Sequence, residues 1–205
     1  MYIPKHYQKK DYQEIKKFLT TYNFATIVTN DGTMPIATHL PVNIEETNDA
    51  LVISGHFAKN NNQWKMIENN DNVLIIFQGP HAYISSTWYE TEDVPTWDYQ
   101  SIHVYGKGRL LNEAQLEADL KKLLNKYESH HEDGATWDNL SPQTQKQIKG
   151  IVGFKVKINK IEAAYKLSQT RSETDKENIV INLNHSDDHN DKNLAREIEK
   201  ENKNK

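Results

Sequence analysis

Residues 24–32 read Phe-Ala-Thr-Ile-Val-Thr-Asn-Asp-Gly, and this stretch points most directly to the fold. Its first part is rich in β-branched side chains, which fit the pleated and half-buried surface of a strand. Asn30-Asp31-Gly32 is a hairpin signal, since Asn and Gly tolerate the positive φ angles that tight turns require. The next strand is expected over Ile36–Ile44, and Pro35 and Pro41 make it an edge or bulged strand.

Similar patterns recur along the chain. Further strands are expected at 50–57 after a polar turn at 45–49, at 73–77, at 82–85 pairing with 73–77, at 99–111, and around Phe154–Ile158. The run at 73–77 is apolar throughout, as in strands buried on both faces. About six or seven strands, with helices added around them, predict a mainly β fold with added helices, built as an antiparallel barrel.

Helices are expected where capping residues precede an apolar stripe. The expected segments are 11–22, 60–69, 112–127, 141–150 and 172–183, with Asp11, Asn112, Ser141 and Ser172 as N-caps. The last part, 184–205, is nearly all polar and charged, which is typical of a frayed helix or of disorder. The expected organisation is therefore one domain over 1–183 followed by a charged tail over 184–205.

Composition restricts the function classes. The chain has 205 residues, a formal net charge of −4, a pI near 6.1 and no cysteine. Disulfides, thiolate metal sites and cysteine nucleophiles are excluded, and the net charge gives no global attraction to nucleic acid. The N-terminus lacks the apolar stretch of a signal peptide, and no apolar run approaches the length of a membrane span. We therefore expect a soluble, cytoplasmic protein.

The stretch 54–60 is the clearest candidate for anion binding. Ser54 and Gly55 would let backbone amides approach a ligand, and a helix beginning near Asn60 would add unpaired N–H groups. Lys59 supplies a full positive charge at the same place. A solvated lysine beside a glycine turn is the plainer interpretation, and taken alone it is the stronger one.

Other chemistry has weaker support. His39, His56, His81 and His103 lie in or beside expected strands, but none is spaced as a helical zinc pair, so no metal site is expected. No Gly-x-Ser-x-Gly turn supports acyl transfer, and no catalytic residue can be assigned. The rings of Trp64, Trp88 and Trp97 either stack on a flat ligand or fill a core or dimer interface.

Ordered blocks of sequence resemble the PaiB family of FMN-binding negative transcriptional regulators. They span roughly 1–183 and comprise Met1–His6, Ala37–Pro41, Gly55–Asn60 with Gln63-Trp64, Phe77–Ser85, Trp88-Tyr89, Pro95–Trp97 with Tyr99, His103, Gly150–Phe154 and Lys166–Gln169. The resemblance implies an FMN-binding split β-barrel that forms a homodimer, with FMN in the groove between subunits.

The resemblance also implies a set of cofactor-binding residues. Lys59 is the counterpart of a lysine that contacts the FMN phosphate, while Thr38 occupies a position where related oxidases carry a phosphate-binding arginine. Asp98 replaces a frequent Asn, and its carboxylate would weaken binding of the phosphate unless it points away. The implied contacts are Thr38, His39, Leu40, Gly55, His56, Ala58, Lys59, Asn60, Trp64, Trp97, Tyr99, Ser101, Lys166, Gln169 and Arg171.

The function implied in this way is negative regulation of genes for protease production and sporulation. Direct DNA binding is implied by the resemblance alone, because the sequence has no helix-turn-helix pattern. An FMN-dependent oxidoreductase, either a flavin reductase or an oxidase, is the alternative, since FMN itself would carry the redox chemistry. A haem-binding split barrel is a weaker alternative.

Overall fold

The computed structural model describes residues 1–47, 50–68 and 70–203, which form two compact units. The terminal unit comprises Met1–Phe18, Gln78–His103 and Glu162–Lys205, and the central unit comprises Leu19–Phe77 and Val104–Ile161. Each unit is described separately below.

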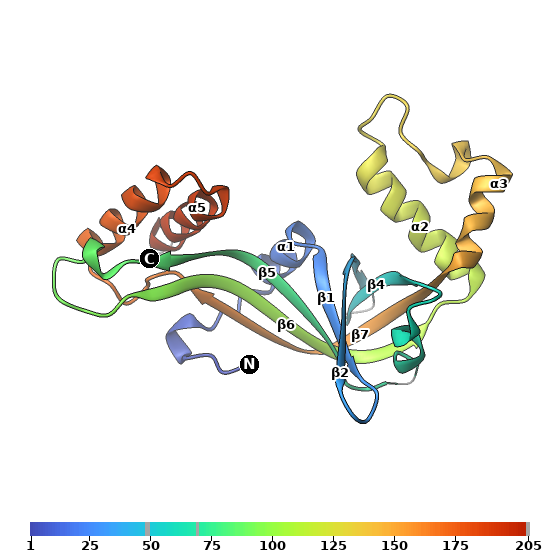
Figure 1. Ribbon diagram of the computed structural model, residues 1–205, viewed down its shortest axis with the longest axis horizontal. Helices are drawn as coiled ribbons and strands as arrows, with labels where there is room; N and C mark the ends of the chain where they lie inside the picture. The colour runs from blue at the N-terminus through green and yellow to red at the C-terminus, as the bar shows by residue number, and fades with distance from the viewer. Residues whose placement is uncertain (48–49, 69, 204–205) are drawn as a thin grey trace. The chain divides into compact units, whose positions relative to one another are not determined.

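Within the described residues, seven strands form one sheet in the order β2-β1-β5-β6-β7-β4-β3. Three of them, β5, β6 and β7, contain residues of both units and are the long strands of Figure 1. The strands are β1 (Phe24–Asn30), β2 (Pro35–Pro41), β3 (Asn43–Thr47), β4 (Ala50–Ala58), β5 (Val73–Ile84), β6 (Thr96–Leu110) and β7 (Ile151–Lys166).

Five α-helices and five short 3-10 helices are the other elements of the described residues. The α-helices are α1 (Tyr12–Thr21), α2 (Glu113–Glu128), α3 (Pro142–Gln145), α4 (Glu173–His185) and α5 (His189–Lys203). The 3-10 helices are η1 (Lys5–Tyr7), η2 (Asn62–Met66), η3 (Ser86–Trp88), η4 (Trp137–Asn139) and η5 (Lys146–Gly150). No helix of the described residues is both long and apolar enough to cross a membrane.

The hairpin expected after residue 24 is present in the central unit. β1 and β2 pair antiparallel from Phe24 opposite Pro41 to Asn30 opposite Pro35. The Asn30 side chain accepts a hydrogen bond from the Gly32 amide at 2.6 Å, and Gly32 has a φ of 98°. The turn chemistry read from the sequence therefore forms this connection.

The single strand expected over Ile36–Ile44 is wrong in one respect, because the chain breaks at Val42 into β2 and β3. The backbone N–H of Val42 bonds to the carbonyl of Asn23 at 2.9 Å, and the Asn23 side chain donates back to the Val42 carbonyl at 3.1 Å. The edge placement is confirmed twice over, since β2 and β3 are the two outermost strands of the sheet.

Two other expected elements differ. The helix expected over 60–69 is only the five-residue η2, and Asn69 lies outside the described residues. The strands expected at 73–77 and 82–85 are one continuous strand, β5, and do not pair with each other. A Cβ at Gly79, inside this strand, would lie 2.6 Å from the Phe18 ring, so the glycine leaves room for that ring. Residues 48–49 of the expected turn at 45–49 also lie outside the described residues.

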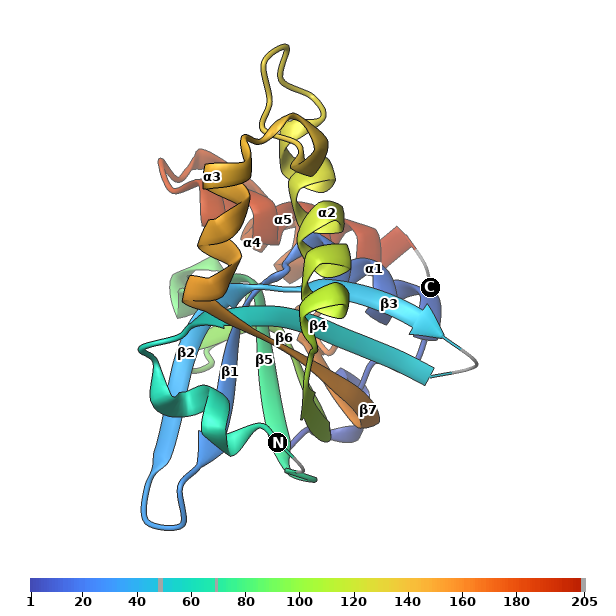
Figure 2. The same cartoon turned by 90° about the vertical axis from the view of Figure 1, so that its right-hand side faces the viewer.

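The helix caps in the central unit agree with the sequence. Asn112 and Gln115 form a reciprocal capping box at the start of α2. The first turns of α2 lie over β4 and β3, where Asp119 accepts a hydrogen bond from the Ser54 hydroxyl (Figure 2). The helix expected over 141–150 begins at the Ser141 cap but becomes the 3-10 helix η5 after one short turn of α3.

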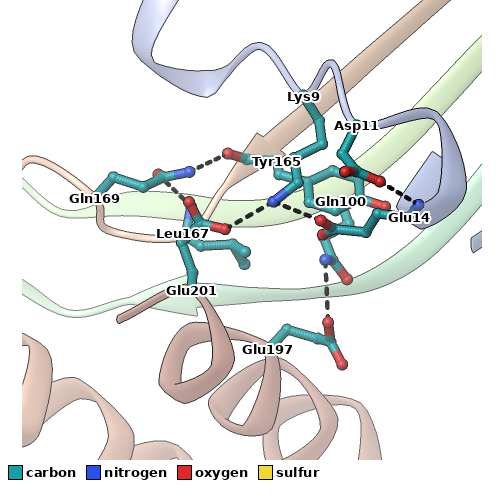
Figure 3. A network of polar contacts seen from close by, with 9 residues as sticks. All are labelled: Lys9, Asp11, Glu14, Gln100, Tyr165, Leu167, Gln169, Glu197 and Glu201. Atoms are coloured by element: carbon teal, nitrogen blue, oxygen red, sulfur yellow. Dashed lines mark hydrogen bonds and ion pairs between the residues drawn. The ribbon is translucent and has the colours of Figure 1, made fainter. Parts of the chain in front are cut away.

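The tail is more ordered than expected. Residues 189–203 form α5, in which Leu194, Ala195 and Ile198 have no exposed surface. In the terminal unit the Lys9 ammonium pairs with Glu201 at 3.2 Å, and the Gln100 amide donates to Glu197 at 3.3 Å (Figure 3). The polar composition predicted a frayed helix or disorder, but α5 carries three apolar side chains on one face and packs against α4.

Candidate functional site

The turn that follows β4 presents a lysine whose charge is not matched by the protein. The backbone N–H of Lys59 bonds to the carbonyl of Gly150 at 2.8 Å, and the Trp64 indole donates to the Lys59 carbonyl at 3.0 Å. The side chains of Lys59 and Asn60 are exposed. Among the described residues no carboxylate pairs with the Lys59 ammonium, so that charge is available to an anionic ligand.

A buried hydrogen-bond network fixes this turn to the β1–β2 hairpin. The Asn61 amide donates to the Thr38 hydroxyl at 2.9 Å, and that hydroxyl donates to Gln63 at 2.5 Å. The Gln63 amide nitrogen donates to the carbonyls of Ile27 and Ile36 at 3.1 and 3.0 Å. Gln63 is only 2% exposed, so the network has little competition from water.

Asn61 and Gln63 were missed as site residues by the sequence reasoning. The expectation of a helix from Asn60 assigned the region an N-terminal helix dipole, but η2 is too short to provide one. The pair Gln63-Trp64 lies in a block that resembles the family, and it indicated this region of the chain. It did not show what the Gln63 side chain does there. The side-chain amides, and not a helix end, are what fix the turn.

The other implied residues of the central unit lie on β2 and β4. Gly55 is buried, and a Cβ there would lie 3.1 Å from both Leu40 and Phe154, so glycine keeps these side chains close. His39 is exposed and its ring stacks near Phe24, with centroids 6.5 Å apart. Ala58 is exposed at the end of β4.

His56 is half-buried on β4. Burial lowers the pKa of the His56 imidazole, and the Asp119 carboxylate opposes this shift. The neutral form of this imidazole, which lies near the turn, is thereby favoured. A neutral imidazole can accept or donate a hydrogen bond, but it adds no fixed positive charge for a phosphate.

In the terminal unit, the ammonium of Lys166 is bound by groups of the same unit. Its ammonium donates to the Thr96 hydroxyl and to the Trp97 carbonyl, the latter at 2.6 Å. It also lies 3.4 Å from the Asp98 carboxylate, whose second oxygen accepts a hydrogen bond from Ser168 at 2.6 Å. Asp98 is only 1% exposed, and burial raises its pKa against the effects of Ser168 and Lys166. The Asp98 carboxylate, which was expected to weaken binding of a phosphate, is thus paired with groups of its own unit.

Arg171 and Gln169 also have protein partners. The Arg171 guanidinium pairs with Asp93 at 2.5 Å and lies 3.9 Å from the centre of the Tyr89 ring. The Gln169 side chain accepts from the Leu167 N–H at 2.8 Å and donates to the Tyr165 carbonyl, so it closes its own turn (Figure 3). These contacts hold the segment that follows β7 in its conformation.

Trp97, Tyr99 and Ser101 alternate along β6 in the terminal unit, so all three point to the same face of the strand. Trp97 is 54% exposed, whereas Tyr99 is half-buried and Ser101 is buried. The implied cofactor residues therefore fall into two groups, one in each unit, and each group is internally organised by hydrogen bonds.

The central group fits a phosphate monoester chemically. The Lys59 ammonium, unmatched among the described residues, and the exposed side-chain amide of Asn60 can donate hydrogen bonds to a phosphate, whereas Asn61 is bonded to Ala58 and Thr38. The position where the resemblance places an arginine of related oxidases is Thr38, whose hydroxyl is bonded to Asn61 and Gln63.

Two solved structures have a similar fold. The flavocytochrome Anf3 from Azotobacter vinelandii has a similar fold at 14% identity, with a TM-score of 0.61 over 85% of this chain and 77% of that one. The FAD and heme binding protein from Mycobacterium smegmatis is similar at 14% identity, with a TM-score of 0.53 over 85% of this chain and 80% of that one. At this identity the likeness shows the split-barrel fold alone.

The sequence comparisons identify the family. Residues 1–160 match the family model described as "Putative FMN-binding domain". The "Protease synthase and sporulation protein PAI 2" of Bacillus subtilis is 46% identical over 200 residues, which cover 97% of each chain. An uncharacterized protein of Saccharomyces cerevisiae is 29% identical over 136 residues, 55% of this chain and 80% of that one. The chain therefore belongs to the PaiB family of FMN-binding split-barrel proteins, and FMN is its cofactor.

Proposed function

We propose that this protein is an FMN-binding negative regulator of genes for protease production and sporulation. The observation that carries the proposal is the 46% identity with the Bacillus subtilis protein over 97% of both chains. Similarity that extends over the whole length includes the peripheral helices and the tail as well as the cofactor domain. A shared biological role is therefore favoured over a shared cofactor alone.

In this proposal the central unit holds the FMN phosphate. Lys59 neutralises its charge, the Asn60 amide donates a hydrogen bond, and Asn61, Gln63 and Thr38 keep the turn in place. FMN when bound supplies one- and two-electron redox chemistry. The implied contacts of the terminal unit, among them Trp97, Tyr99 and Ser101, complete the proposed set. The protein is proposed to act as a cytoplasmic homodimer with FMN in the groove between its subunits.

A basic groove in the central unit supports direct contact with DNA. Lys107 and Arg109 on β6 and Lys155 and Lys157 on β7 line a cavity of about 400 Å³. Lys107 pairs with Asp71 at 2.8 Å. The other three cations have no partner among residues 1–47, 50–68 and 70–203. Such a row suits the phosphates of a DNA backbone, whose binding releases counterions and depends on salt.

The regulatory proposal is tested by complementation. A Bacillus subtilis strain that lacks its PAI 2 protein is supplied with this chain, and extracellular protease activity is measured. The expected result is a return to the protease level of the parent strain. If the chain is produced and folded but protease activity stays at the level of the deletion strain, the proposed role is wrong.

The DNA contact is tested separately by binding to promoter fragments across a range of salt concentrations. The double variant Arg109→Gln/Lys157→Gln is expected to lower the salt slope by about 2, because each phosphate contact contributes about 0.9. The control double variant Lys146→Gln/Lys149→Gln removes two exposed charges outside the groove and is expected to keep the slope. Complementation without any DNA binding would favour regulation through a partner. Oxidation of NADH or NADPH in air by the FMN-loaded protein, without complementation, would favour the oxidoreductase alternative.

A further inference from the structure

A second groove lies entirely within the terminal unit. It has a volume of about 400 Å³ and is bounded by the ends of β5 and β6, by η3 and by the link between α4 and α5. α4 lies against η3 and beside α5 in this unit (Figure 1). None of the residues argued above to hold the FMN phosphate lines this groove.

Aromatic rings form one wall of the groove. The ring of Trp97 lies 6.1 Å from that of His81 and 6.2 Å from that of Tyr83, measured between centroids. Trp97 is 54% and Tyr83 49% exposed, and Trp88 is half-buried beside them. Exposed ring faces carry negative electrostatic potential, and they attract cations that lie over them.

Carboxylates form a second wall of the groove. Asp188 and Asp191 stand at the start of α5 and line the groove, whereas none of its lining residues is Lys or Arg. Asp188 caps α5 by accepting a hydrogen bond from the Asn190 N–H at 2.8 Å. Asp191 has no partner within the described part of the chain. The negative charge of this wall opposes a phosphate and favours a positively charged ligand.

The two walls are held together by fixed contacts. The Asn190 side-chain amide donates to the backbone carbonyl of His81, which joins the start of α5 to β5. Leu194 and Ile198 anchor the same helix with no exposed surface, and Gln100 on β6 bonds to Glu197 (Figure 3). A helix packed in this way keeps the carboxylates at a constant distance from the rings, which lowers the entropic cost of binding.

We propose that this groove binds a small organic cation of the alkylammonium type, with its carbon atoms against the rings and its charge shared between the rings and the carboxylates. The site is distinct from the FMN phosphate turn, and the proposal does not depend on the regulatory function. Trp97 is also an implied FMN contact, so binding has to be measured with the cofactor present and absent.

The test compares choline with 3,3-dimethyl-1-butanol, which has nearly the same shape and no charge. Calorimetry and tryptophan fluorescence are recorded on the full-length protein, both loaded with FMN and free of FMN. Choline is expected to bind saturably and at least about tenfold more tightly than the neutral alcohol, as a cation over several rings requires. Equal affinity for the two compounds, or no saturable choline binding at millimolar concentration, would overturn the proposal.

Variants locate the site. Asp191→Asn is expected to weaken choline binding several-fold and leave binding of the alcohol unchanged. Asp187→Asn, which removes a neighbouring exposed carboxylate outside the groove lining, is the matched control and should have no such effect. Trp97→Phe should retain more affinity than Trp97→Ala, and circular dichroism checks that both are folded. Equal behaviour of the two aspartate variants, or displacement of FMN by choline, would show that no separate cation site exists.

Discussion

Lys59 and Lys166 are both implied FMN contacts, yet they differ in exposure and in their carboxylate partners. Lys59 follows a strand in the central unit, is exposed, and has no carboxylate partner among the described residues. Lys166 ends a strand in the terminal unit, where its side chain is 18% exposed beside an Asp98 that is 1% exposed. One charge is available to a ligand, and the other is already matched by the protein.

The difference shows that residue type and family position do not define a role by themselves. A lysine next to a buried carboxylate mainly stabilises the fold, because the carboxylate would otherwise be unpaired in a poorly solvated place. A lysine without a partner contributes little to stability and can contribute most to binding. The comparison therefore separates a structural cation from a ligand-binding one, and the four predictions below test that separation.

The largest effect is expected for Lys166→Ala. Removing the ammonium leaves the Asp98 carboxylate unpaired, and at pH 7 this is expected to cost about 3 kcal/mol of unfolding free energy. Burial raises the pKa of Asp98, so the folded protein holds this proton more strongly than the unfolded chain does. The cost should accordingly shrink as the pH falls toward 4, because protonation then removes the unpaired charge.

Urea unfolding at pH 7 and pH 4 measures this effect, and Lys160→Ala on the same strand provides the comparison. A loss of FMN affinity with unchanged stability would contradict the structural role of Lys166.

Lys59→Ala tests the opposite behaviour. FMN affinity is expected to fall about tenfold to hundredfold, as for the loss of a charge-assisted phosphate contact. Riboflavin, which has no phosphate, should lose much less, and the unfolding free energy should stay nearly the same. Fluorescence titration with both ligands measures the difference, with Lys146→Ala as the control. Equal losses for the two ligands would place Lys59 away from the phosphate.

Gln63→Ala tests the network that holds the Lys59 turn. It leaves the carbonyls of Ile27 and Ile36 without their side-chain donor, which is expected to cost about 1–3 kcal/mol of stability. FMN affinity should fall as well, because the turn is no longer fixed to the hairpin. Denaturant unfolding and FMN titration are compared with the exposed Gln143→Ala. Full stability in the variant would show that water replaces the glutamine.

The smallest effect concerns His56 and pH. Burial lowers the pKa of His56, so the folded protein binds this proton less readily than the unfolded chain. Stability from this group is complete above about pH 6.5 and is lost as the pH falls below that value. His56→Gln should flatten the decline in unfolding free energy between pH 7 and pH 5. An identical decline in the variant and in wild type would assign the pH dependence elsewhere, and His130→Gln serves as the control.

Much of the fold was predictable because its signals are local. The hairpin at residues 24–41, the Asn112 and Ser172 caps and the alternation of β7 depend on neighbours in sequence. The tail was not predictable, because its three buried apolar side chains are few among many polar ones, and their burial depends on packing against another helix, α4. β5 was misread for a similar reason, since the need for Gly79 comes from Phe18 on another element.

The site was predictable in its position but not in its construction. Lys59 follows from a short stretch and from the family resemblance. The pairing of Asp98 with Lys166 and Ser168 joins segments about seventy residues apart, and no local pattern encodes it. The basic groove could not be predicted either, because Arg109 and Lys157 are far apart in sequence and only the order of the sheet makes their strands neighbours.

The break at Val42 has a consequence for solubility. One continuous segment, residues 35–47, supplies both edge strands of the sheet, β2 and β3. Its residues therefore determine whether either edge can pair with another molecule. Pro35 and Pro41 at the ends of one border cannot donate hydrogen bonds, and Glu45 on the other adds charge. A change that joined the two strands into one longer β-segment would expose a continuous edge, and aggregation would follow before any loss of cofactor binding.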